Sequence, residues 1–284
     1  MLNIKYHIDD FGLTKSITVK LLNLITQRLN FINGVSIIVN TNKKVELWAK
    51  KLIKVDDNIS LYLHLNLIDG KPLFKKAKKI VNDKGFFKHG FVGLFLLSFS
   101  PKFLEYKKEI KSEVELQIIL YLKIIKNIKY KKYNQISLDS HQYVHMLPWV
   151  SDLIFELSKK YNIVFIRSTS EPFILSKISN FFKIWFYKNL LKFFILKLLN
   201  FFNNKKIKKN KKKTNKYFFG IINSGHMDRN YINIVTKQKK INYQILFHPN
   251  IAKKNEKIIF GNNKKIEYYL NDDRVNEFNF ILKN

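Results

Sequence analysis

Three short groups of acidic residues and histidines stand out in this sequence, because each follows an apolar run that predicts a buried β-strand. The groups are Asp9-Asp10-Phe11-Gly12, His64 within Leu63-His64-Leu65-Asn66-Leu67, and Asp139-Ser140-His141. The apolar runs that precede them are Leu2–Ile8, Ile59–Leu63 and Gln135–Leu138. An α/β barrel builds its active site where the carboxyl ends of its parallel strands meet. We therefore expect these side chains to lie in one site.

One carboxylate and two imidazoles suit a divalent metal ion that keeps open coordination positions. Adjacent strand residues point to opposite sides unless the chain turns, and Gly12 allows such a turn. One of Asp9 and Asp10 can then bind a metal while the other acts as a base. His248, which precedes a proline at another expected strand end, is a candidate general acid. The pattern favours a metal-dependent hydrolase and leaves zinc, magnesium and manganese open.

Each of these residues also has an ordinary structural explanation. An isolated Asp-Asp pair is commonly a solvated turn or a helix cap. A histidine such as His64, inside an apolar run, is more often a core residue with its polar atoms satisfied. His141 and His145 are four residues apart and share a face if their segment is helical, and a loop could still present both to one pocket. The joint placement of these residues at strand ends, in a chain with 7 His, favours a functional site.

Short apolar β-runs alternate with helical patterns, which predicts a parallel sheet or barrel built from β–α units. Further strands are expected at Gly34–Asn40, Ile163–Arg167 and Gln244–Phe247. Helices are expected at Thr14–Asn30, Lys44–Ile53, Glu105–Ile128 and Trp149–Lys160. Residues 74–100 are expected to form a long loop with a short apolar helix. We interpret residues 1–284 as one domain.

Composition limits the class of protein. The chain has 284 residues, 46% of them hydrophobic, which allows a sizeable core and excludes a disordered chain. It has no cysteine, which excludes disulfides, thiolate ligands and a cysteine nucleophile and fits a reducing cytosol. The first residues lead directly into a strand, so no cleaved signal peptide is expected. We expect a cytoplasmic protein, with peripheral attachment to the inner membrane face as an option.

The chain is strongly basic, with a formal charge of +31 from 52 Lys plus Arg against 21 Asp plus Glu. A nucleic acid or an anionic membrane would explain such an excess. However, the excess is mostly lysine scattered among Ile and Asn, as an AT-rich genome would produce. Arginine, whose planar fork suits bases and phosphates, is scarce. We therefore expect no nucleic-acid partner.

Residues 174–216 differ from the rest and are interpreted as a basic, aromatic, helical insertion. The stretch from Phe181 to Phe202 is dense in Phe, Leu and Ile with lysines interleaved, and Lys205 to Lys216 is a lysine run. The interleaved lysines argue against a membrane-spanning helix. A helix that lies on an anionic membrane surface, in contact through residues 181–213, fits as well as a helix that covers the barrel.

Longer motifs surround the candidate site residues. The most specific is Leu138-Asp139-Ser140-His141-Gln142-Tyr143-Val144-His145-Met146-Leu147-Pro148. The others are His7–Thr14, Gly34–Asn40, Leu63–Leu67, Gly70–Leu73, Ile166-Arg167 with Glu171-Pro172, Phe218–Met227 and Phe247–Pro249. Together they resemble the YdjC-like carbohydrate deacetylases, the family of the chitooligosaccharide deacetylases and the hopanoid-biosynthesis-associated proteins. Tyr143 stands where that family often has a further His, and His7-Ile8 replaces its familiar Asn-Ala.

This resemblance implies a distorted (β/α) barrel of the glycoside hydrolase/deacetylase type and a metal-dependent N-deacetylase acting on an N-acetylated sugar or glycolipid. The implied residues are Asp10, His64 and His141 as ligands of Mg²⁺ or Zn²⁺, Asp9, His248 and Arg167 as catalytic residues, and His145 and Asn66 as substrate-binding residues. Asp9 would be the base that activates water, and His248 would protonate the leaving amine. Arg167 would orient Asp9 or an intermediate.

Two alternatives keep part of this interpretation. The same metal site could serve another ester, amide or phosphate. The chain could also be a basic peripheral membrane or nucleic-acid-binding protein with a vestigial metal site. Clustered carboxylates repel one another unless a cation lies between them, which counts against a vestigial site. The sugar, the metal and the oligomeric state, with a homodimer as one option, stay open at the level of sequence.

Overall fold

Seven parallel strands form the centre of the molecule in the computed structural model, which describes residues 4–29, 31–175, 177–237, 242–256, 267, 269–270 and 272–283. The strands are β1 (Ile4–Phe11), β2 (Gly34–Ile37), β3 (Ser60–Leu65), β4 (Ile136–Ser140), β5 (Ile163–Ile166), β6 (Tyr217–Phe219) and β7 (Tyr243–Phe247). Their order in the sheet is β5-β4-β3-β2-β1-β7-β6, and all neighbours pair in parallel. β1 is therefore an inner strand of the sheet, between β2 and β7.

The two outer strands approach each other through the segment that precedes β6. The Lys213 amide donates to the Val164 carbonyl at 2.9 Å, and the Ile166 amide donates to the Lys213 carbonyl at 3.0 Å. Further along, the Phe218 amide donates to the Ser170 carbonyl at 3.1 Å. These bonds curl the sheet toward closure. The expected α/β fold with a distorted barrel is confirmed.

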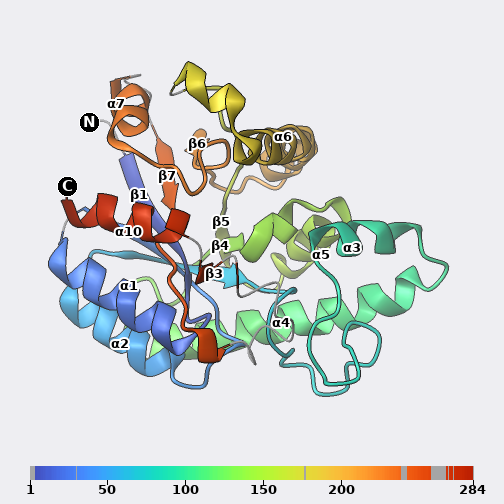
Figure 1. The fold of residues 1–284 in the computed structure, drawn as a ribbon. Helices are drawn as coiled ribbons and strands as arrows, with labels where there is room; N and C mark the ends of the chain where they lie inside the picture. Colours follow the sequence, from blue (N-terminus) through green and yellow to red (C-terminus); the bar gives the residue numbers. More distant parts are fainter. Residues whose placement is uncertain are drawn as a thin grey trace.

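Helices cover the outside of the curled sheet, as β–α units require (Figure 1). They are α1 (Lys15–Gln27), α2 (Val45–Val55), α3 (Phe91–Leu96), α4 (Phe103–Asn127), α5 (Pro148–Leu157), α6 (Ile184–Lys209), α7 (Arg229–Lys237) and α10 (Asp272–Lys283). Short 3₁₀ helices lie at Leu97–Phe99, His141–Met146, Ile178–Phe182 and Lys254–Glu256. In Figure 1, α1 and α2 lie together on one flank of the sheet, while α3 and α5 lie on the other.

The core lies between the strands and these helices. All residues of β2 and β7 are buried, which is the pattern of strands covered on both faces. In α1, Ile17, Leu21 and Leu24 recur at helical spacing and are fully buried. The Thr14 side chain accepts a hydrogen bond from the Ile17 amide at 3.2 Å, so the helix begins directly after the Asp-Asp-Phe-Gly turn.

The elements differ from the sequence-based expectation mainly at their ends. β1 continues through the Asp pair to Phe11, and β4 continues through Asp139 to Ser140. The basic segment contains one long helix, α6. β6, α7 and α10 were not expected, and β6 is too short to show a period. The expected strand start at Leu2 and helix end at Asn30 lie outside the described residues.

Candidate active site

The carboxyl ends of β1, β3 and β4 meet at a cavity of about 480 Å³. Asp9 and Asp10 from β1, His64 from β3 and His141 just after β4 all line this cavity. The register of the sheet brings them together, since His64 pairs directly with Asp139 of β4. The structure therefore places the three sequence groups in one site.

A local irregularity of β1 puts both of its carboxylates on the same side. The pairing with β2 shifts register between Ile8 and Phe11, and Asp10 has a φ of 65°, in the left-handed region. Two residues later Gly12 has a φ of 98°, and a Cβ there would lie 2.4 Å from the Ile38 carbonyl oxygen. Only glycine satisfies both conditions without strain. The turn thus begins at Asp10 itself, two residues earlier than Gly12.

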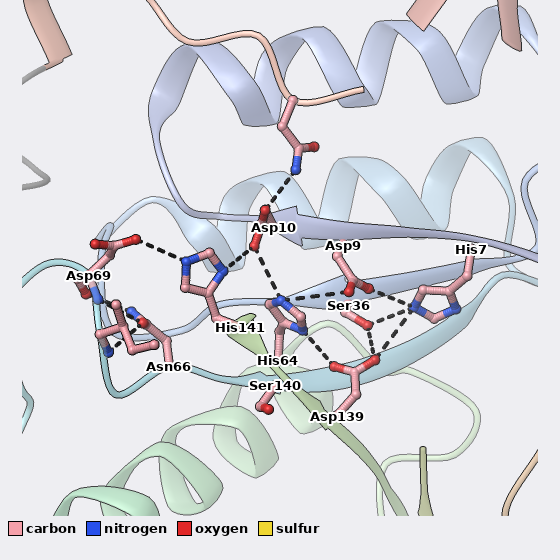
Figure 2. A network of polar contacts seen from close by, with 12 residues as sticks. His7, Asp9, Asp10, Ser36, His64, Asn66, Asp69, Asp139, Ser140 and His141 are labelled. Carbon is pink, nitrogen blue, oxygen red and sulfur yellow. Dashed lines mark hydrogen bonds and ion pairs between the residues drawn. The ribbon is translucent and has the colours of Figure 1, made fainter. Parts of the chain in front are cut away.

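The Asp10 carboxylate lies between the two histidines (Figure 2). Its Oδ1 is 3.2 Å from His64 Nε2 and 2.6 Å from His141 Nδ1. The second nitrogen of each ring contacts another carboxylate: His64 Nδ1 lies 2.6 Å from Asp139 Oδ1, and His141 Nε2 lies 2.9 Å from Asp69 Oδ2. Each imidazole is thus fixed by an outer carboxylate and presents its other nitrogen to Asp10, as metal-ligating histidines do.

These three side chains fit a divalent metal ion. One ligand atom from each of Asp10, His64 and His141 lies within 4.8 Å of the other two, and all three residues are buried. The set combines one hard oxygen with two imidazole nitrogens, and the adjoining cavity leaves room for further ligands. Oxygen and nitrogen donors of this kind accept zinc, magnesium or manganese.

The protonation of the site reflects its excess of carboxylates. Burial lowers the pKa of both histidines, but the neighbouring carboxylates outweigh it. The pKa of His64 rises to about 10, chiefly through Asp9 and Asp139, and that of His141 rises to about 9, chiefly through Asp10. Burial raises the pKa of Asp10, yet the two histidines hold it well below its usual range. Without a metal ion, two imidazolium ions therefore offset part of the negative charge of the carboxylates.

Arg167, fully buried at the end of β5, supplies the fixed positive charge of the site. Its Nη1 and Nη2 donate to the two oxygens of Asp9 at 2.7 and 2.9 Å, and Nη2 also lies 2.5 Å from Asp139 Oδ2. Burial raises the pKa of Asp9, but Arg167 and His64 outweigh it and lower the net value. His7, Asp9 and Asp139 form a second group with metal-ligand spacing. Because Arg167 already contacts both of its carboxylates, the first group is the better candidate for a metal ion.

His248 lines the cavity beyond the end of β7. Its Nδ1 is buried and has no hydrogen-bond partner among the described residues. Burial and the charge of Arg274 lower the pKa of His248 to about 3, so its ring is neutral at neutral pH. Two residues later, Asn250 Nδ2 donates to Asp10 Oδ2 at 2.7 Å. The end of β7 therefore both fixes the Asp10 carboxylate and adds an imidazole to the cavity.

Two residues expected to bind substrate do not line the cavity. His145 is buried behind it, where Nδ1 lies 2.5 Å from Ser140 Oγ and Nε2 lies 3.1 Å from the Arg167 carbonyl. The Asn66 side chain accepts from the Ile68 and Asp69 amides and donates to the Asp69 carbonyl at 2.7 Å. Both side chains are occupied in holding the chain around the site. Neither residue lines the cavity in this structure, and their contact with substrate stays a prediction.

Sequence reasoning missed several residues of the site. They are Asp69 behind His141, Asn250 beside Asp10, Tyr269, whose hydroxyl is 3.3 Å from His141 Nε2, and Asp139 as the anchor of His64 and Arg167. The sequence does contain a signal for the role of Asp139, because Asp139 and His141 are two residues apart at a strand end and share a side of the strand. The sequence contains no such signal for Asp69 and Tyr269, since both residues lie outside regular strand patterns.

A parallel α/β barrel whose strand ends carry a buried carboxylate–imidazole cluster defines the class of this protein. Within that class, the chain belongs to the YdjC-like protein family, whose model matches residues 4–284. A carbohydrate deacetylase of Clostridium beijerinckii is 26% identical over 162 residues, covering 55% of this chain and 56% of that protein. One from Danio rerio is 27% identical over 168 residues, covering 58% and 49%. The matched region thus spans about half the length of these curated relatives.

A solved structure shares the fold over nearly the whole chain. It is an Enterococcus faecalis protein that carries the provisional name cellobiose-phosphate cleavage protein. The two structures superpose with a TM-score of 0.58 at 14% sequence identity, covering 98% of this chain and 94% of the other. At this identity the likeness establishes the architecture alone.

Proposed function

We propose that this protein is a metal-dependent hydrolase that removes the acetyl group from an N-acetylated sugar. The observation that carries the proposal is the convergence of Asp10, His64 and His141 beside the Asp9 carboxylate on one cavity wall. Amide hydrolysis needs an electrophile at the carbonyl oxygen and a base for the attacking water. The names of the curated relatives support the N-acetyl sugar as the substrate class.

Asp10, His64 and His141 would hold the metal. A divalent cation bound there would polarise the acetamide carbonyl and make water more acidic. Asp139 and Asp69 keep the two imidazoles in the tautomers that expose one nitrogen to the ion, and Asn250 holds the second oxygen of Asp10. These outer contacts fix the ligands before substrate arrives.

Asp9 acts as the general base in this proposal. Both of its oxygens are bound by the Arg167 fork, which fixes the orientation of the carboxylate and keeps it ionised. One oxygen also lies 3.9 Å from His64 Nε2, so the base faces the metal-binding side chains. Arg167 never needs to touch the substrate to serve this purpose, and we class it as a positioning residue.

His248 acts at the leaving nitrogen in this proposal. Because its pKa of about 3 keeps the ring neutral, His248 is not protonated before the reaction begins. It can hydrogen-bond the leaving nitrogen and pass on the proton that Asp9 takes from water. This differs from the sequence-based expectation of a pre-protonated acid and predicts that activity persists above neutral pH.

The test measures metal content and acetate release on native protein and three variants, with a panel of N-acetylated sugars that includes chitobiose. His141→Gln should lose both metal and activity, whereas Asp9→Asn should keep the metal and lose activity by about 10²–10⁴-fold. His89→Gln, which changes a histidine outside the cavity lining, is the matched control and should keep both. Bound metal with no acetate from any sugar would refute the substrate class. Full activity of the metal-stripped protein would refute the proposed metal dependence.

A further inference from the structure

Helix α6 is apolar on two opposite sides. One side packs into the molecule through Phe186, Phe193, Leu196 and Leu199. The other side is exposed and carries what we call the α6 stripe: Ile184, Tyr187, Leu191, Phe194, Leu198 and Phe201. These stripe residues are between 55% and 76% exposed and recur at alternating spacings of three and four. A helix that is apolar all round normally has both sides covered, so the stripe lacks its partner in the isolated chain.

The exposed apolar surface is concentrated around this helix. Of the 21 exposed large hydrophobic residues in the described chain, 10 lie between residues 181 and 202. Four more, Val92, Phe95, Leu96 and Phe99, lie on α3 and the turn that follows it. Soluble proteins scatter such residues singly, and their concentration on α6 and α3, which border the same cavity, indicates an interaction surface, called the patch below.

The patch borders the mouth of the active-site cavity. Leu191 of the stripe and its neighbour Ile195 line that cavity, as do Phe91 and Val92 of α3. An occupant of the patch would therefore meet the path by which substrate enters.

Charge distinguishes between two occupants of the patch. Residues 172–227 contain no Asp or Glu, while exposed lysines such as Lys183, Lys188, Lys197 and Lys205 flank the stripe. A second copy docked through the stripe would bring lysines against lysines with no acid between them. An anionic lipid surface would accept the apolar side chains and pair with the lysines.

We propose that α6 and α3 dock this protein on an anionic membrane and that its natural substrate is an N-acetylated sugar carried on a lipid. The substrate part of this inference rests on the proposed deacetylase function. The apolar rim would enter the bilayer while the sugar reaches Asp9 and the metal-binding cluster in the cavity. None of the helices in the described ranges is long and apolar enough to cross a membrane.

The first test is co-sedimentation of the full chain with vesicles of phosphatidylcholine containing about 30% phosphatidylglycerol. The double variant Phe194→Glu/Leu198→Glu changes two stripe residues outside the cavity lining. Their side chains are 57% and 62% exposed, so the substitutions leave the core unchanged. We expect the double variant to bind about tenfold more weakly, and pure phosphatidylcholine to bind native protein more weakly by a similar factor. Leu47→Glu, a control on α2 with 51% exposure, should bind like native protein.

The second test compares acetate release from a soluble N-acetylated sugar and from an N-acetylglucosaminyl lipid in the same vesicles. The double variant should keep the soluble rate and lose about tenfold on the lipid-borne substrate. Equal vesicle binding by native protein and double variant would overturn the docking surface. A native protein that is dimeric in solution, and that becomes monomeric in the double variant, would overturn it as well. If the native protein binds the vesicles but releases acetate from none of the sugars, the proposed deacetylase function is refuted and the docking surface is still supported.

Discussion

Metal binding should release about two protons at pH 7.5, because a divalent ion replaces the charge that the two imidazolium ions now supply. Asp9, Asp10, Asp69 and Asp139 bring four negative charges to the cluster, and Arg167 returns one positive charge. Three net negative charges remain while the imidazoles are neutral. Two protons or one divalent cation reduce them to the same single charge. Since the ligands must be deprotonated to bind metal, the protons leave as the ion enters.

The pKa values give the size and sign of this effect. At pH 7.5 both His64 and His141 are protonated in the metal-free protein, since their pKa values are about 10 and about 9. As pH falls, protons compete more strongly with the metal. The logarithm of the apparent affinity should therefore rise by about two per pH unit between roughly pH 6 and 8.

Calorimetric titration of metal-stripped protein with Mn²⁺ or Zn²⁺, in two buffers of different ionisation enthalpy, measures the proton count directly. Asp139→Asn removes the partner of His64 Nδ1 and should reduce the number of protons released. His89→Gln should leave the number unchanged. Release of fewer than about one proton by the native protein would refute the charge balance we derive.

Three further predictions concern the framework of the site. Arg167→Met should lower the free energy of unfolding in denaturant titrations by about 3–5 kcal/mol, because two buried carboxylates lose their counter-charge; a loss below 1 kcal/mol would contradict this. Gly12→Ala should cost about 2–4 kcal/mol, because φ is 98° and the new Cβ meets a carbonyl oxygen at 2.4 Å. Gly85→Ala, at a φ of 74° with open space, is the control and should cost about 1 kcal/mol. Burial raises the pKa of Glu171 to about 7, so the folded state holds a proton that the unfolded state loses above pH 4.5. Between pH 4.5 and 7 the stability of native protein should therefore fall by about 3 kcal/mol relative to Glu171→Gln, and a constant difference would show that the carboxyl is ionised throughout.

The sequence was sufficient for six of the seven strands, all except β6, because parallel strands have strong local signals. Continuous apolar runs such as the one before His64 are covered on both faces, and their burial follows directly from composition. The meeting of Asp10, His64 and His141 also followed, since the carboxyl ends of parallel strands share one edge.

Other features of the site depend on tertiary contacts that no local pattern encodes. The left-handed conformation of Asp10, rather than the glycine after it, turns β1 toward the cavity. The sequence predicts that His145 binds substrate, yet its hydrogen bond to the Arg167 carbonyl holds it behind the cavity. The helix α10 contributes Glu277, which binds the His248 amide, from a part of the chain with no recognisable motif.

The position of β1 between β2 and β7 also bears on how the protein is synthesised. Residues 34–37 reach β1 soon after it is made, but its other edge pairs with β7, where Ile4 lies opposite Tyr243. Until most of the chain has left the ribosome, the strand that carries both aspartates keeps one edge of unpaired amides and carbonyls. Such an edge can pair with another nascent chain, so slow or truncated synthesis should lead to aggregation rather than to a partly active fragment. The strand that carries both aspartates precedes the other six strands in the sequence and is among the last to be paired along both edges.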